Sequence, residues 1–406
     1  MTLVMTVLVR DEADIIVPMI EYHLAAGVDR IIVTDNGSID GTRQILARYA
    51  ADERVVVEDD PVQDKNQSKK VTRMARRAAT EFGADWVINA DADEFFVPLD
   101  RSMNLREVFA RMPVEIVSAV IPVIDMTGEP TVDGAGIEAL VFRDERVEEG
   151  LYQRSGLHAH ATHDAIHVGS ADVTVAQGNH HVSLASQGPV PPELSIESLH
   201  FPWRSYRQFE KKVVNAGRAY EASPHLRPSP RHHGMRDYRL WRAGVLEAAY
   251  IFRHPPASEL GAAELLKDEW LHERLLSIAR TGAATCPDLL DRALARVGAR
   301  YDAASLEHSR DIMQPVLAID EERTALAVRA AASAQAETAV RSQLEVAQRR
   351  IAELEQETVE LADELTRVSA ELTRIEEHPA FRVSRATLRW ARSMSPANII
   401  GHVRRK

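Results

Sequence analysis

Short apolar runs alternate with amphipathic segments along the first hundred residues of the chain. The apolar runs predict β-strands over residues 3–9, 30–34, 55–57 and 86–90. Helical spacing of apolar residues predicts helices over 15–26, 42–49 and 69–82, and glycines follow two of them. This alternation of strand and helix implies right-handed crossovers between parallel strands. We therefore expect an α/β, Rossmann-like fold with a mainly parallel sheet flanked by helices.

The pattern changes beyond residue 97. Apolar runs such as 117–124 predict further strands before about residue 185, and helical spacing returns over 205–317. We expect four parts, which are an α/β core over 1–185, a helical part of the same unit over 186–315, a coiled coil over 316–378 and a basic amphipathic tail over 379–406.

A strict heptad of apolar residues marks the coiled-coil segment. From Val340 to Ile375 these residues are spaced alternately by four and three, and neither Gly nor Pro interrupts residues 318–378. So narrow a stripe is typical of the seam between two helices, and it is about 50 Å long at 1.5 Å per residue. We expect a homodimer through 340–375. The alternative is a long helix that packs on the globular part.

Composition and charge narrow the class of protein. The chain has 406 residues, 45% of them hydrophobic, and a net charge of −12, which argues against a dedicated nucleic-acid binder. Its one cysteine, Cys286, excludes a disulfide framework and fits a reducing compartment. No apolar run of about 20 residues predicts a transmembrane helix, and the first residues do not resemble a signal peptide. We therefore expect a soluble, cytoplasmic protein.

The tail over 379–406 carries a charge opposite to the rest of the chain. It holds seven Arg and Lys residues and no Asp or Glu, and its apolar residues include Val383, Leu388 and Trp390. A basic amphipathic helix of this composition fits an anionic membrane surface. We expect either a peripheral contact at the inner face of a membrane or a solvated basic end.

Polar residues follow three of the predicted strands at the point where each strand ends. They occupy 9–12 after the first strand, 35–42 after the second and 91–95 after the fourth. Because ligands of open parallel sheets bind at the carboxyl ends of the strands, we expect one site there. Asp91 and Asp93 are spaced to hold Mg²⁺ or Mn²⁺, which prefer carboxylate oxygens. The alternative is that they cap the next helix.

Other enzyme classes with strand-end motifs fit less well. No glycine-rich dinucleotide fingerprint follows the first strand, and no P-loop sequence occurs. Haloacid-dehalogenase-type phosphatases also carry two Asp residues after a strand, but normally after the first strand and with Thr or Val two residues later. Here the strand is the fourth, and Phe95 takes that position.

Taken together, four motifs resemble glycosyltransferase family 2. They are Val9 to Glu12, Glu21 to His23 with Gly27 to Asp29, Asp35 to Thr42, and Trp86 to Phe96. The resemblance covers about residues 1–255 and is closer to the branch with an Asp-Ala-Asp-Glu-Phe motif. It implies a GT-A fold, a nucleotide-diphosphate-sugar donor, Mn²⁺ or Mg²⁺ at the DxD motif, and inversion at the anomeric carbon.

The same resemblance implies roles for individual residues. The nucleotide would contact Val9, Arg10, Asp11, Asp35, Asn36 and Asp91, and the metal ligands would be Asp91, Asp93 and His200. Many family members have two acids where this chain has Asp35 and Asn36, so base recognition differs in detail. Arg204, Lys211 and Lys70, with Lys212 beside them, are candidates to meet the charge of the diphosphate.

Inversion also requires a group that takes the proton from the acceptor hydroxyl. The candidates are Asp164, Glu197 and Glu94, and each of them is otherwise a solvated or capping acid. We expect a glycosyltransferase that moves a sugar from a nucleotide-diphosphate donor to a hydroxyl acceptor such as a glycan or glycolipid. The alternative is a non-catalytic scaffold that binds nucleotide or glycan and is dimerised by the coiled coil.

Overall fold

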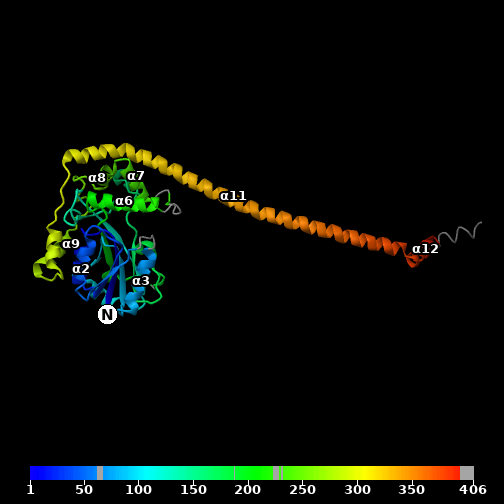
Figure 1. The fold of residues 1–406 in the computed structure, drawn as a ribbon, viewed down its shortest axis with the longest axis horizontal. Helices are drawn as coiled ribbons and strands as arrows, with labels where there is room; N and C mark the ends of the chain where they lie inside the picture. The colour runs from blue at the N-terminus through cyan, green and yellow to red at the C-terminus, as the bar shows by residue number, and fades with distance from the viewer. Residues whose placement is uncertain (62–66, 187, 223–227, 230–231, 394–406) are drawn as a thin grey trace, which may run out of the picture. The chain divides into compact units, whose positions relative to one another are not determined.

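The computed structural model describes residues 1–61, 67–186, 188–222, 228–229 and 232–393. The chain forms two compact units, Met1–Thr324 and Ala325–Lys406. The first unit holds two β-sheets and the helices that cover them. In the second, the structure describes the remainder of one long helix and a shorter helix (Figure 1).

The main sheet of the first unit has six strands in the order β3-β2-β1-β4-β9-β6. Four strands run parallel, namely β1 (Leu3–Val9), β2 (Arg30–Asp35), β3 (Val55–Asp59) and β4 (Trp86–Ala90). The next strand, β9 (Asp164–Val168), is antiparallel to β4 and to β6 (Ser118–Ile121). Val9 pairs with Asp35 at the last position of the β1–β2 ladder, so the carboxyl ends of these strands share one edge of the sheet.

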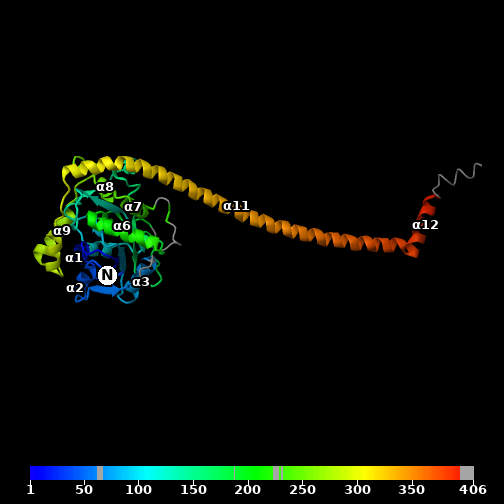
Figure 2. The ribbon, with the colours of Figure 1, turned by 45° about the horizontal axis from the view of Figure 1, so that its top comes forward.

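Alternation along β1 explains its nearly continuous apolar run. Leu3, Met5 and Val7 join the core of α1 (Ile16–Ala25), α2 (Thr42–Tyr49) and α4 (Leu105–Arg111), whereas Val4 packs with α3 (Gln67–Thr80). Helices thus bury both faces of the sheet, with α1 and α2 on one side and α3 on the other (Figure 2). The expected α/β fold, with a central sheet flanked by helices, is confirmed.

A second sheet, which the sequence patterns do not separate from the first, has the order β5-β10-β7-β8. Its strands are β5 (Glu94–Pro98), β10 (Ile196–His200), β7 (Val123–Thr127) and the short β8 (Phe142–Arg143). Because β5 begins directly after Asp93, the apolar residues after the DxD motif lead the chain into this sheet. The strand predicted over 117–124 is divided between β6 and β7, and thus between the two sheets.

The helices after β10 form two groups. Residues of α6 (Tyr206–Glu221), α7 (His233–Arg242) and α8 (Leu246–Arg253) share a core with α5 (Leu151–Ser155). In contrast, α9 (Trp270–Thr281) and α10 (Pro287–Leu294) pack against α1. The buried carboxylate of Glu21 in α1 accepts hydrogen bonds from the Tyr49 hydroxyl and from the Cys286 N–H, each at 2.7 Å. This carboxylate therefore fixes the start of α10 on the main core.

One long helix, α11 (Ala303–Glu377), begins in the first unit and makes up much of the second. Its first turns carry Pro315, and the neighbouring Met313 and Leu317 are buried in the core of α6 to α8. The helix therefore starts before the boundary predicted at residue 316. The long C-terminal helix that the sequence predicts is confirmed.

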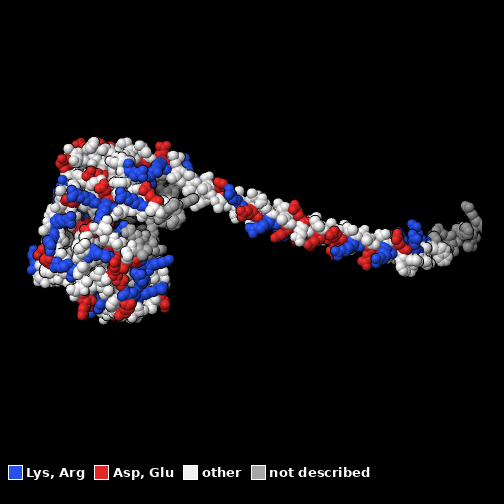
Figure 3. All heavy atoms as spheres, in the orientation of Figure 1, with Lys and Arg blue, Asp and Glu red and all other residues white. Residues whose placement is uncertain are grey.

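The heptad residues of α11 are exposed in the single chain. Their exposed fractions run from 45% at Leu354 to 71% at Leu365. Acidic and basic side chains are interspersed along the same stretch (Figure 3). A short helix, α12 (Pro379–Ser393), follows within the predicted tail. None of the helices that the structure describes is long and apolar enough to cross a membrane. Pairing of two α11 helices stays a prediction.

Candidate active site at the carboxyl edge of the main sheet

The DxD motif forms the turn that joins the two sheets. The Glu94 carboxylate accepts the Asp91 N–H at 2.8 Å, and the Phe201 N–H donates to the Asp93 carbonyl at 2.8 Å. The Asp93 side chain is buried. Glu94 thereby holds the backbone of this turn in place.

A fully buried arginine ties the DxD turn to the loop after β1. The Arg204 guanidinium donates to Asp14 at 2.7 and 3.2 Å, to Glu12, to Asp93 at 3.1 Å and to the Phe201 carbonyl at 3.1 Å. These five hydrogen bonds use every N–H that a guanidinium offers. Arg204 therefore has no donor left for the diphosphate contact predicted from the sequence, and its place in the structure is internal.

Lys212 is the cation that faces the DxD motif from α6. Its Nζ lies 3.1 Å from Asp93 Oδ2, and half of its side chain is exposed. Burial alone would raise the pKa of Asp93, but the charges of Lys212, His200 and Arg204 outweigh burial and hold that pKa well below its usual range. Asp93 is thus ionised and paired with two cations.

His200 is oriented by a buried carboxylate that the sequence analysis does not single out. Its Nδ1 lies 2.7 Å from Asp125 Oδ1, which leaves Nε2 facing Asp93 Oδ2 at 3.9 Å. His160 lies on the other Asp125 oxygen, with Nδ1 at 3.4 Å, while its Nε2 contacts the Arg146 carbonyl at 2.6 Å. Since both ring nitrogens of His160 face acceptors, the imidazolium form is favoured, and Asp125 raises the pKa of His160 to about 9.

Asp91 lies beside two other acids, Glu94 and Asp164, and few positive charges balance these three carboxylates. Asp91 Oδ1 accepts from Gln67 and from Asn179, each at 3.3 Å. Burial and the charge of Asp91 raise the pKa of the buried Asp164 to about 7. Burial and the same charge raise the pKa of Glu94 well above its usual value. Both carboxylate oxygens of Asp164 lack a hydrogen-bond partner in the part of the chain that the structure describes.

The third base candidate lies in a different environment. Glu197, in the second sheet, accepts from Arg101 at 2.7 Å and from Arg143 at 2.8 and 2.9 Å. A carboxylate held by two guanidinium groups is stabilised in its charged form and is a poor proton acceptor. Asp164 combines a raised pKa with a carboxylate that no guanidinium and no backbone N–H holds within the described ranges. Its neighbours are the Glu94 carboxyl and His180, whose Nδ1 lies 3.9 Å from Asp164 Oδ1.

The predicted nucleotide-binding residues lie together where β1 and β2 end. Asp11 has a left-handed backbone (φ 61°), and its carboxylate accepts the Ile39 N–H at 2.8 Å. Asp35 accepts the Ser38 N–H at 2.9 Å. These two carboxylates shape the loop after β2 from within. The Asn36 N–H donates to the Val9 carbonyl at 2.8 Å, which holds the two strand ends together.

Basic side chains border the same loops. Lys211 Nζ lies 3.3 Å from Asp11 Oδ1 and 3.6 Å from Asp40 Oδ2. The buried Nε of Arg10 has no hydrogen-bond partner within the described ranges. Lys70, by contrast, is buried in α3 and lies 3.5 Å from Asp60. Among the basic residues predicted to meet the diphosphate, Lys211 remains at the mouth of the site, and Lys212 lies beside it.

The predicted metal ligands do not form a ready-made site. Two carboxylates and an imidazole are suitable donors for Mg²⁺ or Mn²⁺. However, the described residues contain no group of three such side chains close enough to hold an ion. The reason at Asp93 is that Lys212 and Arg204 already occupy its Oδ2. The present geometry therefore does not fit a three-ligand metal site, and the requirement for Mn²⁺ or Mg²⁺ stays a prediction.

Several site residues escape the sequence analysis although weak signals point to some of them. Glu12 and Asp14 follow Asp11 in and just after the first strand-end motif, where an acid that pairs internally looks the same as one that binds a ligand. Asp125 interrupts an otherwise apolar run, which is a signal for a buried charge with a partner. His160 offers no signal of this kind, because its partner lies 35 residues away.

Comparison with known proteins agrees with a glycosyltransferase. Residues 4–123 match the model of glycosyltransferase family 92. The motifs were identified as resembling family 2, so the match supports the class of enzyme but not that family. No curated protein shows a significant match. The match ends at residue 123, so it covers β1 to β6 and the DxD turn but not Asp164 or His200.

Solved structures resemble the chain only loosely. They include Staphylococcus aureus TarS 1–349, with 13% identity and a TM-score of 0.29 over 73% of this chain and 90% of that chain. The same protein in complex with UDP-GlcNAc has 12% identity and a TM-score of 0.32 over 63% of this chain and 67% of that one. TM-scores of this size do not establish a shared fold.

Proposed function

We propose that this protein is a glycosyltransferase that moves a sugar from a nucleotide-diphosphate donor to a hydroxyl acceptor. The observation that carries the proposal is the meeting of three polar strand ends at one edge of the main sheet, within the segment that matches a glycosyltransferase family. Ligands of open α/β sheets bind at this edge. The buried Asp93 and the half-buried Asp91, beside the half-buried Lys211 and the exposed Lys212, give this edge the charges that a diphosphate requires.

The donor would lie across the ends of β1, β2 and β4. Asp11, Asp35 and Asn36 border the place of the base and ribose, and Lys211 and Lys212 are the lysines that border the place of the diphosphate. Positive charge held there stabilises the nucleoside diphosphate as it leaves. Because Asp91, Asp93 and His200 do not form a three-ligand site among the described residues, no step of the proposed transfer is assigned to Mn²⁺ or Mg²⁺.

Asp164 is the proposed general base. In an inverting transfer, the acceptor hydroxyl gives its proton to the Asp164 carboxylate while the acceptor oxygen bonds to the anomeric carbon. The bond from that carbon to the diphosphate oxygen breaks in the same step, and the diphosphate takes the electron pair. Glu94 is bound by a backbone N–H and Glu197 by guanidinium groups, whereas neither kind of donor holds Asp164 among the described residues, which supports Asp164 as the base.

The test is donor turnover by the full-length chain. UDP-, GDP- and dTDP-sugars are offered with EDTA or with Mn²⁺, and nucleoside diphosphate release and transfer products are measured. Asp91→Asn is expected to lower turnover at least about a hundredfold, since it removes one charge from the reacting edge. The exposed Glu193→Gln serves as the matched acid-to-amide control. Nucleotide binding without any turnover would favour the scaffold alternative, and full activity of Asp91→Asn would contradict the proposal.

Dimerisation through the exposed seam of α11 is part of the proposal. Leu354 and Leu361 lie seven residues apart on the apolar stripe. The double variant Leu354→Asp/Leu361→Asp is expected to be monomeric in analytical ultracentrifugation, where the parent sediments as a dimer. Gln356→Asp, on the polar part of the same helix, is the control and should leave the dimer intact. A parent chain that is monomeric at micromolar concentration would contradict this part.

We further propose that α12 contacts an anionic membrane surface. Arg382, Arg385 and Arg389 share one face of this helix at spacings of three and four, and the exposed Val383 and Trp390 share another. Vesicles with 30% anionic lipid are expected to retain the protein by flotation, whereas neutral vesicles are not. The control is a chain in which the three arginines are replaced by Gln, and equal retention of both chains would contradict the idea.

A further inference from the structure

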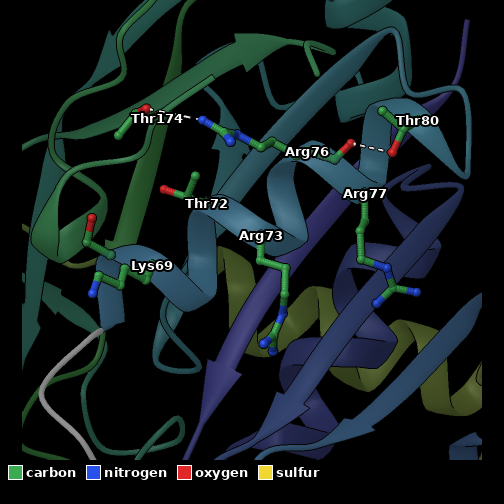
Figure 4. A pocket seen from close by; sticks show the side chains of 8 residues that line it. Lys69, Thr72, Arg73, Arg76, Arg77, Thr80 and Thr174 are labelled. Carbon is green, nitrogen blue, oxygen red and sulfur yellow. Dashed lines mark hydrogen bonds between the residues drawn. The ribbon is translucent and has the colours of Figure 1, made fainter. Parts of the chain in front are cut away.

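A basic groove runs along the outer side of α3, and its lining residues take no part in the site described above. The hollow measures about 520 Å³, and its charged and polar walls are formed by Lys69, Thr72, Arg73, Arg76, Arg77 and Thr174 (Figure 4). Four of these side chains are basic, and no acid belongs to the lining. A strongly basic concave surface is unexpected on a chain whose net charge is −12.

The helix geometry of α3 produces this groove. Residues 69, 72, 73, 76 and 77 recur at spacings of three and four, so they share one face of the helix. The opposite face holds Val71, Met74, Ala75 and Ala78, which are buried against the sheet. Four of the five basic residues of α3 therefore lie on the face that does not pack against the core, and the fifth, Lys70, is buried.

Acidic side chains balance two of the four cations, Arg77 and Arg73, but not the other two. Arg77 pairs with Glu58 and Glu81, and Arg73 lies 3.5 Å from Asp60. Their charges are therefore largely balanced.

Arg76 and Lys69 differ from that pair. Arg76 donates to the Val173 carbonyl at 2.7 Å and approaches the Thr174 hydroxyl at 3.5 Å, and both acceptors are neutral (Figure 4). Neutral acceptors fix the guanidinium without cancelling its charge. No carboxylate pairs with Lys69 in the part of α3 that the structure describes.

The groove begins at the candidate active site. Gln67, the first residue of α3, donates to Asp91 Oδ1 at 3.3 Å, and Ser68 and Lys69 follow it directly into the groove. At 1.5 Å per residue, Arg76 lies about 14 Å along the helix from Gln67. The nucleotide-binding candidates belong to the loops after β1 and β2. The groove belongs to α3, so a ligand in it would approach the DxD turn from another direction than the nucleotide.

We propose that this groove binds an anionic stretch of the acceptor, a glycan that carries carboxylate, sulfate or phosphate groups. The inference rests on the proposed glycosyl transfer and names the class of its acceptor. Lys69 and Arg76 are seven residues apart, about 10 Å along the helix, so they would meet successive anionic groups of an extended chain. The hydroxyl that receives the sugar would then lie beyond Lys69, next to Asp91.

The test uses the double variant Lys69→Gln/Arg76→Gln in the full-length protein. Its control, Lys267→Gln/Arg292→Gln, removes the same two residue types from exposed positions elsewhere. Binding is measured by calorimetry with polyphosphate, dextran sulfate, polygalacturonate and neutral dextran at low and moderate salt. We expect the parent and the control to bind at least one polyanion but not neutral dextran, and the groove variant to bind about tenfold more weakly or worse.

Donor hydrolysis without acceptor separates this proposal from the proposed function. The groove variant should hydrolyse the donor at the parental rate, because neither replaced side chain contacts the proposed nucleotide site. A parent that binds none of the three polyanions, or a groove variant that binds them as the control does, would overturn the groove proposal alone. Equal binding of a short RNA duplex would also overturn it, since the groove would then be a non-specific polyanion site. A parent without donor turnover would instead overturn the glycosyl transfer on which the proposal rests.

Discussion

Replacing Asp164 by Asn should make the folded protein more stable and the enzyme inactive. Asp164 is almost completely buried, and neither of its oxygens has a hydrogen-bond partner in the described part of the chain. Burial and the neighbouring Asp91 raise its pKa from 3.8 to about 7. The folded chain therefore holds this proton across a pH range in which the unfolded chain releases it.

The size of the effect follows from that pKa difference. Between pH 3.8 and about 7 the folded state binds more protons than the unfolded state, so the free energy of unfolding falls as the pH rises. The loss is about 1.4 kcal/mol for each pH unit within this window. From pH 5 to pH 8 it amounts to about 3 kcal/mol, because the slope ends near pH 7. The neutral amide of Asp164→Asn has no proton to lose and escapes this cost.

Urea unfolding of the parent and of Asp164→Asn at pH 5 and pH 8, with EDTA present, measures the difference. We expect the variant to gain about 3 kcal/mol relative to the parent between the two pH values. The pKa of Glu12 does not depend on Asp164, so its titration is the same in both proteins and cancels. The pKa of Glu94 is raised in part by Asp164 and therefore falls in the variant, so part of the measured difference arises at Glu94. Parallel pH profiles of the two proteins would refute the assignment of a raised pKa to Asp164.

The same carboxylate predicts the pH dependence of transfer. A base with a pKa of about 7 is about one-tenth ionised at pH 6, so kcat/KM should rise about tenfold from pH 6 to pH 8. Asp164→Asn should abolish transfer over this whole range. A variant that is stabilised at pH 8 and yet still transfers sugar would show that Asp164 is a strained structural acid and not the base.

Two further predictions concern buried carboxylates outside the reaction. Asp125→Asn removes the charge that holds the proton on His160, so the pKa of His160, followed by NMR of its ring protons, should fall from about 9 toward 6.5. An unchanged pKa would contradict the pairing. Glu21→Gln weakens the hydrogen bonds from Tyr49 and Cys286, and it should lower the free energy of unfolding by about 1–3 kcal/mol. Calorimetry of the full chain measures this change, and an unaltered Tm would contradict it.

The fold could be predicted where its signal is local. The period of two along β1 and the period near 3.6 along α3 each arise within a few residues, because each element buries its own apolar face. The second sheet has no local signal. β5 pairs with β10 about a hundred residues later, so Phe95 and Phe96 look like the end of a strand in the first sheet although they belong to another.

The candidate site likewise contains residues that have a local sequence signal and residues that have none. Asp91, Asp93 and Asp35 could be found because their motifs follow strands, and strand ends meet at one edge whatever the loops do. The role of Arg204 could not be read from the sequence, since its partners Glu12 and Asp14 lie about 190 residues earlier. An arginine near a predicted phosphate site looks the same whether it is exposed or enclosed by carboxylates.

The two aspartates of the DxD motif thus have different electrostatic surroundings although one residue separates them. Asp93 faces Arg204 and Lys212, and these cations keep its pKa low despite burial. Asp91 faces the acids of Glu94 and Asp164, and burial with the charge of Asp93 raises its pKa. The turn therefore places Asp93, whose charge is balanced by Arg204 and Lys212, close to Asp91, whose charge is balanced less. A group that brings positive charge would gain more from Asp91, while Asp93 maintains the connection between the DxD turn, the loop after β1 and α6.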